Sequence, residues 1–163
     1  GRLLVALLIE HWKLLGSPLL YLSVAFKRHH QAYYDHLSSV RDRGDWEGWT
    51  RFFLECVRES ADDAVGSATR LHALIGGDRR KIVNHPKATV SAVRLFDLLP
   101  ENPMVTLPSV IELLKTTKPT AGKAIDALVH AGVLGETTGR KRDRIYAYKA
   151  YLRILEEDTA VPR

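Results

Sequence analysis

The residues best suited to bind a ligand are basic, and they gather in one stretch of the chain. Between Lys115 and Lys149 there are eight Lys or Arg and three Asp or Glu, a net charge of +5 that equals the excess of the whole chain. Such a concentration favours an anionic partner, of which nucleic acid is one. The candidate contact residues are Lys118, Thr120, Lys123, Arg140, Lys141, Arg142 and Arg144.

Two short helices are predicted to position the first three of these residues. Residues 107–114 form an apolar segment with Pro108 in its first turn, where the missing N–H leaves no bond unmade. A polar break follows, and Thr117 is a suitable N-cap for a second helix. That helix presents one apolar face, made of Ala121, Ala124, Ile125, Leu128 and Val129. The three candidate residues then lie on its polar side, near the end that enters a major groove in helix-turn-helix proteins.

A hairpin is predicted to carry the other four candidates. Gly132 ends the second helix, residues 133–138 suit a strand, and residues 145–148 alternate as a returning strand. The charged loop 139–144 joins them and is placed to reach phosphates or a minor groove. With a preceding helix over 88–99, this order predicts a winged helix-turn-helix. Duplex DNA is a candidate partner, and dimerisation, packing between domains and a merely solvated loop are the alternatives to it.

The first half of the chain is predicted to be helical. Apolar periodicity favours helices over 1–15, 19–26, 31–43 and 46–75, the last capped by Asp45 and resuming over 78–85 after two glycines. Trp46 and Trp49 are expected to anchor it in the core. The predicted fold is therefore mainly α, with a helical domain over 1–85 and a winged helix over 86–163.

Composition excludes several classes of site. A single cysteine, Cys56, permits neither an intrachain disulfide nor a cysteine zinc site, and it fits a reducing, cytoplasmic location. The apolar start of the chain is too short to span a bilayer, so no membrane partner is expected. The histidines show no zinc-site spacing, and no resident metal is predicted.

Several stretches of the chain resemble the Fic family. They are residues 1–4, the Ser-Pro-Leu-Leu-Tyr-Leu-Ser run at 17–23, the tyrosine pair at 33–34, the Gly-Asp-Trp-Glu-x-Trp run at 44–49, residues 52–54, and the basic stretch 138–144, which is similar to the winged-helix extension of many bacterial members. The resemblance covers nearly the whole chain in order. It implies a helical remnant of a Fic domain followed by that extension.

Fic proteins typically transfer AMP from ATP to a hydroxyl of a target protein. The resemblance places the final arginine of the family's His-Pro-Phe-x-Asp/Glu-Gly-Asn-Gly-Arg-x-x-Arg motif on Arg2, and an aromatic near adenine on Tyr34. The rest of the motif is expected before Gly1, so ATP, Mg²⁺ and a protein substrate are implied for the parent, and this chain alone is expected to be inactive. A frayed terminus for Arg2 and core packing for Tyr34 remain alternatives, as do a DNA-binding regulator and an oligomerisation module that forms a homodimer.

Overall fold

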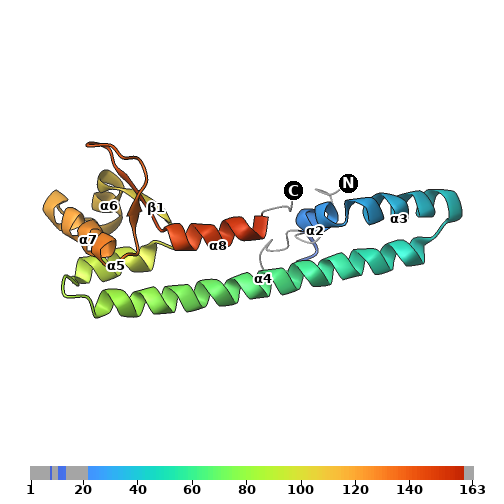
Figure 1. The fold of residues 1–163 in the computed structure, drawn as a ribbon, viewed down its shortest axis with the longest axis horizontal. Helices are drawn as coiled ribbons and strands as arrows, with labels where there is room; N and C mark the ends of the chain where they lie inside the picture. The colour runs from blue at the N-terminus through green and yellow to red at the C-terminus, as the bar shows by residue number, and fades with distance from the viewer. Residues whose placement is uncertain (1–7, 9–10, 14–21, 160–163) are drawn as a thin grey trace. The chain divides into compact units, whose positions relative to one another are not determined.

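The computed structural model describes residues 8, 11–13 and 22–159. Within that part the chain is mainly helical, with seven helices and a three-stranded antiparallel sheet (Figure 1). The predicted helix over 1–15 lies largely outside the described residues. The elements are α2 (Leu22–Arg28), α3 (His30–Arg43), α4 (Trp46–Val83), α5 (Val90–Leu98), β1 (Met104–Thr106), α6 (Leu107–Leu114), α7 (Lys118–His130), β2 (Gly135–Glu136), β3 (Ile145–Ala147) and α8 (Lys149–Thr159).

The chain divides into two compact units. The first runs to Ala68 and also takes the chain from Glu157 onward, while the second runs from Thr69 to Glu156. The division therefore falls within α4, earlier than the boundary expected after residue 85. Helix α4 itself is continuous through Gly76 and Gly77, where the sequence predicted a weakening. Two helical glycines cost about 2 kcal/mol relative to alanine, and the apolar packing of the neighbouring Leu74, Ile75 and Ile82 offsets it.

An aromatic cluster forms the core of the first unit. Phe26 of α2 lies 5.1 Å from Tyr33 of α3 and 6.3 Å from Phe52 of α4, measured between ring centroids. Trp49 joins the cluster through an edge contact with Tyr33 at 5.5 Å, as predicted. The prediction for Trp46 was wrong, because its side chain is 66% exposed. Trp46 precedes Phe52 by six residues, which places it about 120° around the helix from the buried face.

The turn between α3 and α4 follows the residues that the sequence provides for it. Gly44 adopts φ of 70°, a left-handed conformation that glycine enters without steric cost, and it ends α3. Asp45 then caps α4, since its Oδ1 accepts a hydrogen bond from the backbone N–H of Gly48 at 2.9 Å. This turn fixes the direction in which α4 leaves the first unit's core.

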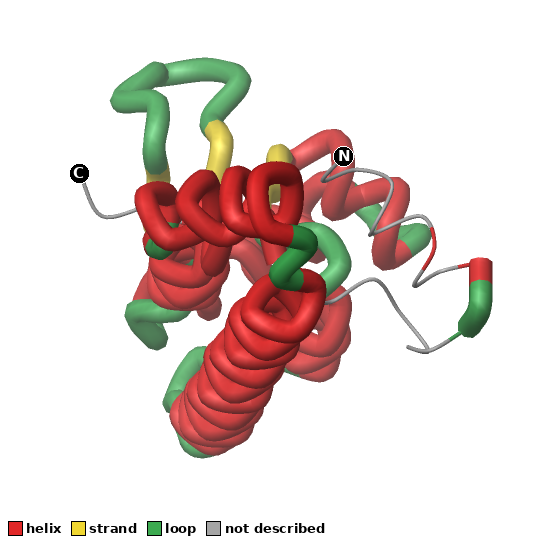
Figure 2. The backbone as a smooth tube through the Cα atoms, turned by 90° about the vertical axis from the view of Figure 1, so that its right-hand side faces the viewer, coloured by secondary structure: helices red, strands yellow, loops and turns green. Residues whose placement is uncertain are grey.

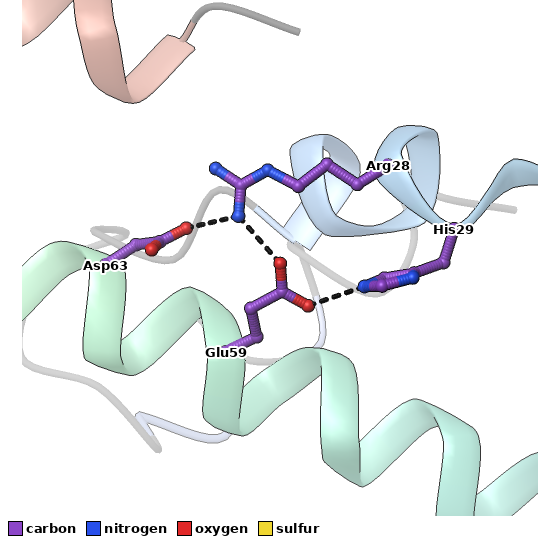
Figure 3. A network of polar contacts seen from close by, with 4 residues as sticks. All are labelled: Arg28, His29, Glu59 and Asp63. Atoms are coloured by element: carbon purple, nitrogen blue, oxygen red, sulfur yellow. Dashed lines mark hydrogen bonds and ion pairs between the residues drawn. The ribbon is translucent and has the colours of Figure 1, made fainter. Parts of the chain in front are cut away.

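A charged network ties α2 to α4 in the first unit (Figure 3). The Nη1 atom of Arg28 donates to Glu59 Oε1 at 2.7 Å and to Asp63 Oδ2 at 2.6 Å. The other carboxylate oxygen of Glu59 lies 2.7 Å from Nε2 of His29. The hydrogen bond from Arg28 is the main reason that the pKa of Glu59 lies below its ordinary value. Glu59 is therefore ionised when the first unit is folded at neutral pH.

Helices α5, α6 and α7, the end of α4, the start of α8 and the sheet form the second unit around one apolar core. Thr89 caps α5 by accepting from Ala92 N at 3.0 Å. Thr106 and Ser109 form a reciprocal capping box at the start of α6. Strand β3 is central: it pairs antiparallel with β1 and with β2, giving the order β1-β3-β2. Helix α6 matches its predicted bounds, whereas β1 and α8 were not predicted.

A buried hydrogen bond joins the sheet to α4 within the second unit. The hydroxyl of Tyr148, which follows β3, donates to Oδ2 of Asp78 at 2.8 Å. Lys81 Nζ lies 2.7 Å from Oδ1 of the same carboxylate. Asp78 is 5% exposed and Tyr148 is fully buried. Burial, followed by this hydrogen bond, raises the pKa of Tyr148 well above its ordinary value, so the phenol stays a donor.

The substitution Glu59→Gln should destabilise the protein at neutral pH by up to about 1 kcal/mol, because the pair is partly exposed and screened. The pKa of folded Glu59 is depressed, so its contribution is present above the unfolded value of 4.5 and is lost as pH falls through the folded value. Urea unfolding between pH 7 and pH 3 measures the free energy of unfolding of the unaltered chain and of Glu59→Gln. The difference between the two should shrink as the pH falls. Glu55→Gln, which changes an exposed α4 glutamate, is the control, and a gap that widened in acid would contradict the assignment.

The substitution Tyr148→Phe should lower the free energy of unfolding by about 1–3 kcal/mol, because it leaves a buried carboxylate oxygen of Asp78 without its donor. Chemical denaturation followed by circular dichroism measures the change. Tyr146→Phe removes a hydroxyl from a half-buried tyrosine two residues earlier and should change stability by less than about 0.5 kcal/mol. Equal losses in both variants would show that the buried hydrogen bond is not the cause.

Candidate nucleic-acid interface

The connection between α6 and α7 sets the position of Lys118. Helix α6 ends at Leu114, and its C-cap Lys115 adopts a left-handed conformation with φ of 49°. Thr116 N then donates to Ile111 O at 3.1 Å. Thr117 is the residue before α7, as predicted, but its hydroxyl lies 3.0 Å from the Thr120 hydroxyl and caps no backbone N–H. The turn is therefore tight, and Lys118 stands exposed in the first turn of α7.

The loop between β2 and β3 holds the second group of cations. Figure 2 shows it as a long segment that extends beyond the strands. Its base is closed where Thr137 N donates to Ile145 O at 3.0 Å. Nearer the tip, Arg144 Nε donates to the carbonyl of Arg140 at 2.9 Å, and Gly139 takes φ of 63°. The loop is thus a folded turn with internal hydrogen bonds.

These two regions meet at an open cleft of about 730 Å³. One wall is the start of α6 with the start of α7, and the other is the β2–β3 loop with β3. Four of the seven predicted contact residues line it. The lining residues are Leu107, Pro108, Ile111, Lys118, Lys141, Arg142, Asp143, Arg144 and Tyr146. The structure therefore joins Lys118 to loop cations that are more than twenty positions away in the sequence.

Three cations of the cleft have no carboxylate partner among the described residues. Within the described part of the chain, no ion pair involves Lys118, Lys141 or Arg142, and all three side chains are exposed. Asp143 is the one carboxylate among the lining residues. Because these cations line one cleft, they can contact the same ligand, and their attraction for it is screened by salt over about 8 Å at physiological ionic strength. The cleft therefore suits a ligand with several negative charges, such as a phosphate backbone.

Three predicted contact residues do not line this cleft. Thr120 and Lys123 lie on α7 at about 160° and 140° around the helix from Lys118. Thr120 is half-buried and Lys123 is exposed. Arg140 is exposed on the loop, and its carbonyl accepts the bond from Arg144. Lys123 and Arg140 are thus available to a ligand that extends beyond the cleft, whereas Thr120 offers less surface.

Several residues of the site were not predicted from the sequence. Leu107, Ile111 and Tyr146 give the cleft an apolar lining. Val129 does not line the cleft, but it differs from its prediction: it was expected on the buried face of α7, and its side chain is 36% exposed. Glu136, which accepts hydrogen bonds from Thr138 and Gly139 of the loop, is not among the predicted contact residues. Its position in the hairpin before a Thr-Thr-Gly run was the available signal, since such residues offer N–H and hydroxyl donors to a nearby carboxylate.

The residues predicted for nucleotide binding form no site in the described part of the chain. Arg2 lies outside the described residues. Tyr34 is 48% exposed, and its ring contacts the rings of His30 at 4.8 Å and Tyr33 at 5.2 Å. Cys56 is buried, and burial raises the pKa of its thiol to about 11, which disfavours a nucleophilic thiolate. No group of metal-ligating side chains occurs among the described residues.

Comparison with known families gives no assignment, since no protein-family model matches the chain. Among the described residues, no helix combines the length and apolar character that crossing a membrane requires.

Proposed function

We propose that the second unit contains a winged helix-turn-helix, over residues 90–148, that binds duplex DNA. The observation that carries this proposal is the cleft in which Lys118 of α7 faces Lys141 and Arg142 of the β2–β3 loop. In the proposed complex α7 enters the major groove by its N-terminal end. The β2–β3 loop contacts the phosphates beside that groove.

The order of the elements supports the fold assignment. The chain runs α5, β1, α6, α7, β2 and β3, so two helices joined by a tight turn are followed by a hairpin. The short strand β1 completes the sheet by pairing with β3. A helix pair with a sheet on one side leaves the polar face of α7 uncovered, and Lys123 and Asp126 are exposed there. Such a face can approach the edges of base pairs.

The distribution of charge favours DNA over an apolar protein partner. The cleft has cations on both walls and a single carboxylate. Protein interfaces are depleted of lysine at their centres, whereas nucleic-acid interfaces are rich in basic side chains. Oligomerisation through this surface would bring like charges together unless the partner surface were acidic. Phosphates supply the negative charge without that requirement.

The double variant Lys118→Ala with Arg142→Ala should bind a 20-base-pair duplex about tenfold more weakly than the unaltered chain at low salt. Each lost phosphate contact removes about one unit from the slope of log affinity against log salt, so the slope should fall by about two. Fluorescence anisotropy with labelled duplex, repeated at several salt concentrations, measures both quantities.

The matched control is Lys27→Ala with Arg58→Ala, which removes the same charge from exposed positions of the first unit. It should bind as the unaltered chain does. An equal loss in both double variants would show that net charge alone drives binding. If the unaltered chain does not bind the duplex, the proposal fails, and sedimentation analysis would then test the oligomerisation alternative.

We also propose that the first unit derives from the C-terminal part of a Fic-family AMP-transferase. The residues that carry the resemblance include Tyr33 and Trp49, and their rings pack together at 5.5 Å. Gly44 and Asp45 of the same stretches form the turn between α3 and α4. These residues therefore have structural roles that a shared helical scaffold would preserve. AMP transfer to a protein, with ATP and Mg²⁺, is the activity proposed for the parent.

The 163 residues contain no His-Pro-Phe and no Gly-Asn-Gly sequence. Incubation of this chain with ATP radiolabelled at the α-phosphate, Mg²⁺ and a cell lysate should therefore transfer no AMP to protein, because the general base and the phosphate-binding turn of that chemistry are lacking. A competent AMP-transferase added to the same lysate is the positive control. Labelling above the background of lysate alone would overturn this part of the proposal.

A further inference from the structure

An acidic residue lies at the base of the basic loop, where its charge opposes the attraction of an anion. Glu136 is the last residue of β2, and it precedes a loop with four Lys or Arg. We propose that the carboxylate of Glu136 is a positioning residue for DNA binding, which holds the β2–β3 loop in the conformation that presents Lys141 and Arg142. This inference rests on the proposed function of the second unit.

The hydrogen bonds of Glu136 carry the inference. Its Oε1 accepts from Thr138 N at 2.7 Å and also from the Thr138 hydroxyl. Gly139 N donates to Oε1 at 3.0 Å and to Oε2 at 2.9 Å. One carboxylate therefore collects the donors of two consecutive loop residues. The Glu136 backbone is held in turn, because its carbonyl accepts from Lys149 Nζ at 3.3 Å.

The rest of the loop depends on that turn. Gly139 has φ of 63°, a left-handed conformation that turns the chain toward the tip. From there the chain reaches Arg140, whose carbonyl accepts from Arg144 Nε at 2.9 Å. Asp143 between them also has a positive φ, of 52°. These contacts follow one another along the loop, so releasing Thr138 and Gly139 would free the segment that bears the cations.

Electrostatics alone does not explain a glutamate at this position. Its hydrogen bond from the Thr138 hydroxyl, with the backbone bonds and the nearby Arg144, holds the pKa of Glu136 below its ordinary value. The side chain is therefore charged at neutral pH and reduces the positive potential of the loop. The order that Glu136 gives to the loop compensates for this loss of positive potential, because a loop already in its bound conformation loses less entropy when DNA binds.

Two substitutions separate the roles of charge and hydrogen bonding. Glu136→Ala and Glu136→Gln both remove one negative charge, but glutamine keeps an oxygen that accepts from Thr138 and Gly139. We expect Glu136→Ala to weaken binding of the 20-base-pair duplex by about fivefold. Glu136→Gln should bind as well as the unaltered chain or better. A third variant, Thr138→Val, changes no charge and should weaken binding about twofold.

Amide hydrogen exchange at Thr138 and Gly139 provides a readout that does not involve DNA. Exchange should accelerate in Glu136→Ala and stay slow in Glu136→Gln, while the thermal unfolding of both variants matches that of the unaltered chain. Equal duplex affinities for the two Glu136 variants would overturn the inference even where DNA binding itself is established. Absence of binding by the unaltered chain would instead refute the proposed function and this role of Glu136 with it, whereas the exchange rates would still show whether Glu136 orders the loop.

Discussion

The second unit depends on one buried hydrogen bond, between the phenol of Tyr148 and the carboxylate of Asp78. A buried carboxylate is tolerated only where donors satisfy it, and here Tyr148 and Lys81 do so. Tyr148 also donates its backbone N–H to Pro103 O at 2.8 Å, and its ring lies 5.9 Å from that of Phe96. One residue thus fixes the end of β3 to α4, to the start of β1 and to α5. Since β1 and β2 both pair with β3, the base of the basic loop is fixed as well.

The local part of this fold was readable from the sequence. Both ends of helix α6 were predicted correctly, because the proline of its first turn and its apolar spacing lie within eight consecutive positions. Strand β1 was not predicted, because three residues are too few to show a periodicity and form a strand only by pairing with β3. The role of Asp78 was hidden for a similar reason. Asp78 follows two glycines and precedes Arg79, a local sequence that indicates an exposed position. Its hydrogen-bond partner, Tyr148, is seventy residues further along the chain.

The candidate site shows the same division between local and distant information. The sequence identified which residue types could bind phosphate, and all seven lie in the expected helix and loop. It could not show which of them share a surface, since that depends on how α7 faces the hairpin. Helical geometry separates Lys118 from Thr120 and Lys123, whereas the fold brings Lys118 to Lys141 and Arg142. The packing of the core beneath α7 and the hairpin brings these residues together, and the local sequence does not show that packing.

Two acidic residues of the second unit, Asp78 and Glu136, form no ion pair with the cleft cations among the described residues. Asp78 is buried, where it accepts from the Tyr148 hydroxyl and pairs with Lys81. Glu136 directs its carboxylate to hydrogen-bond donors of its own loop, so it forms no ion pair there among the described residues. The charge of Glu136 lowers the positive potential of the loop, but Lys141 and Arg142 stay without an ion pair within the described part of the chain and can contact a ligand. The net charge of +5 is therefore only part of the explanation, because its effect depends on which acids are already engaged elsewhere.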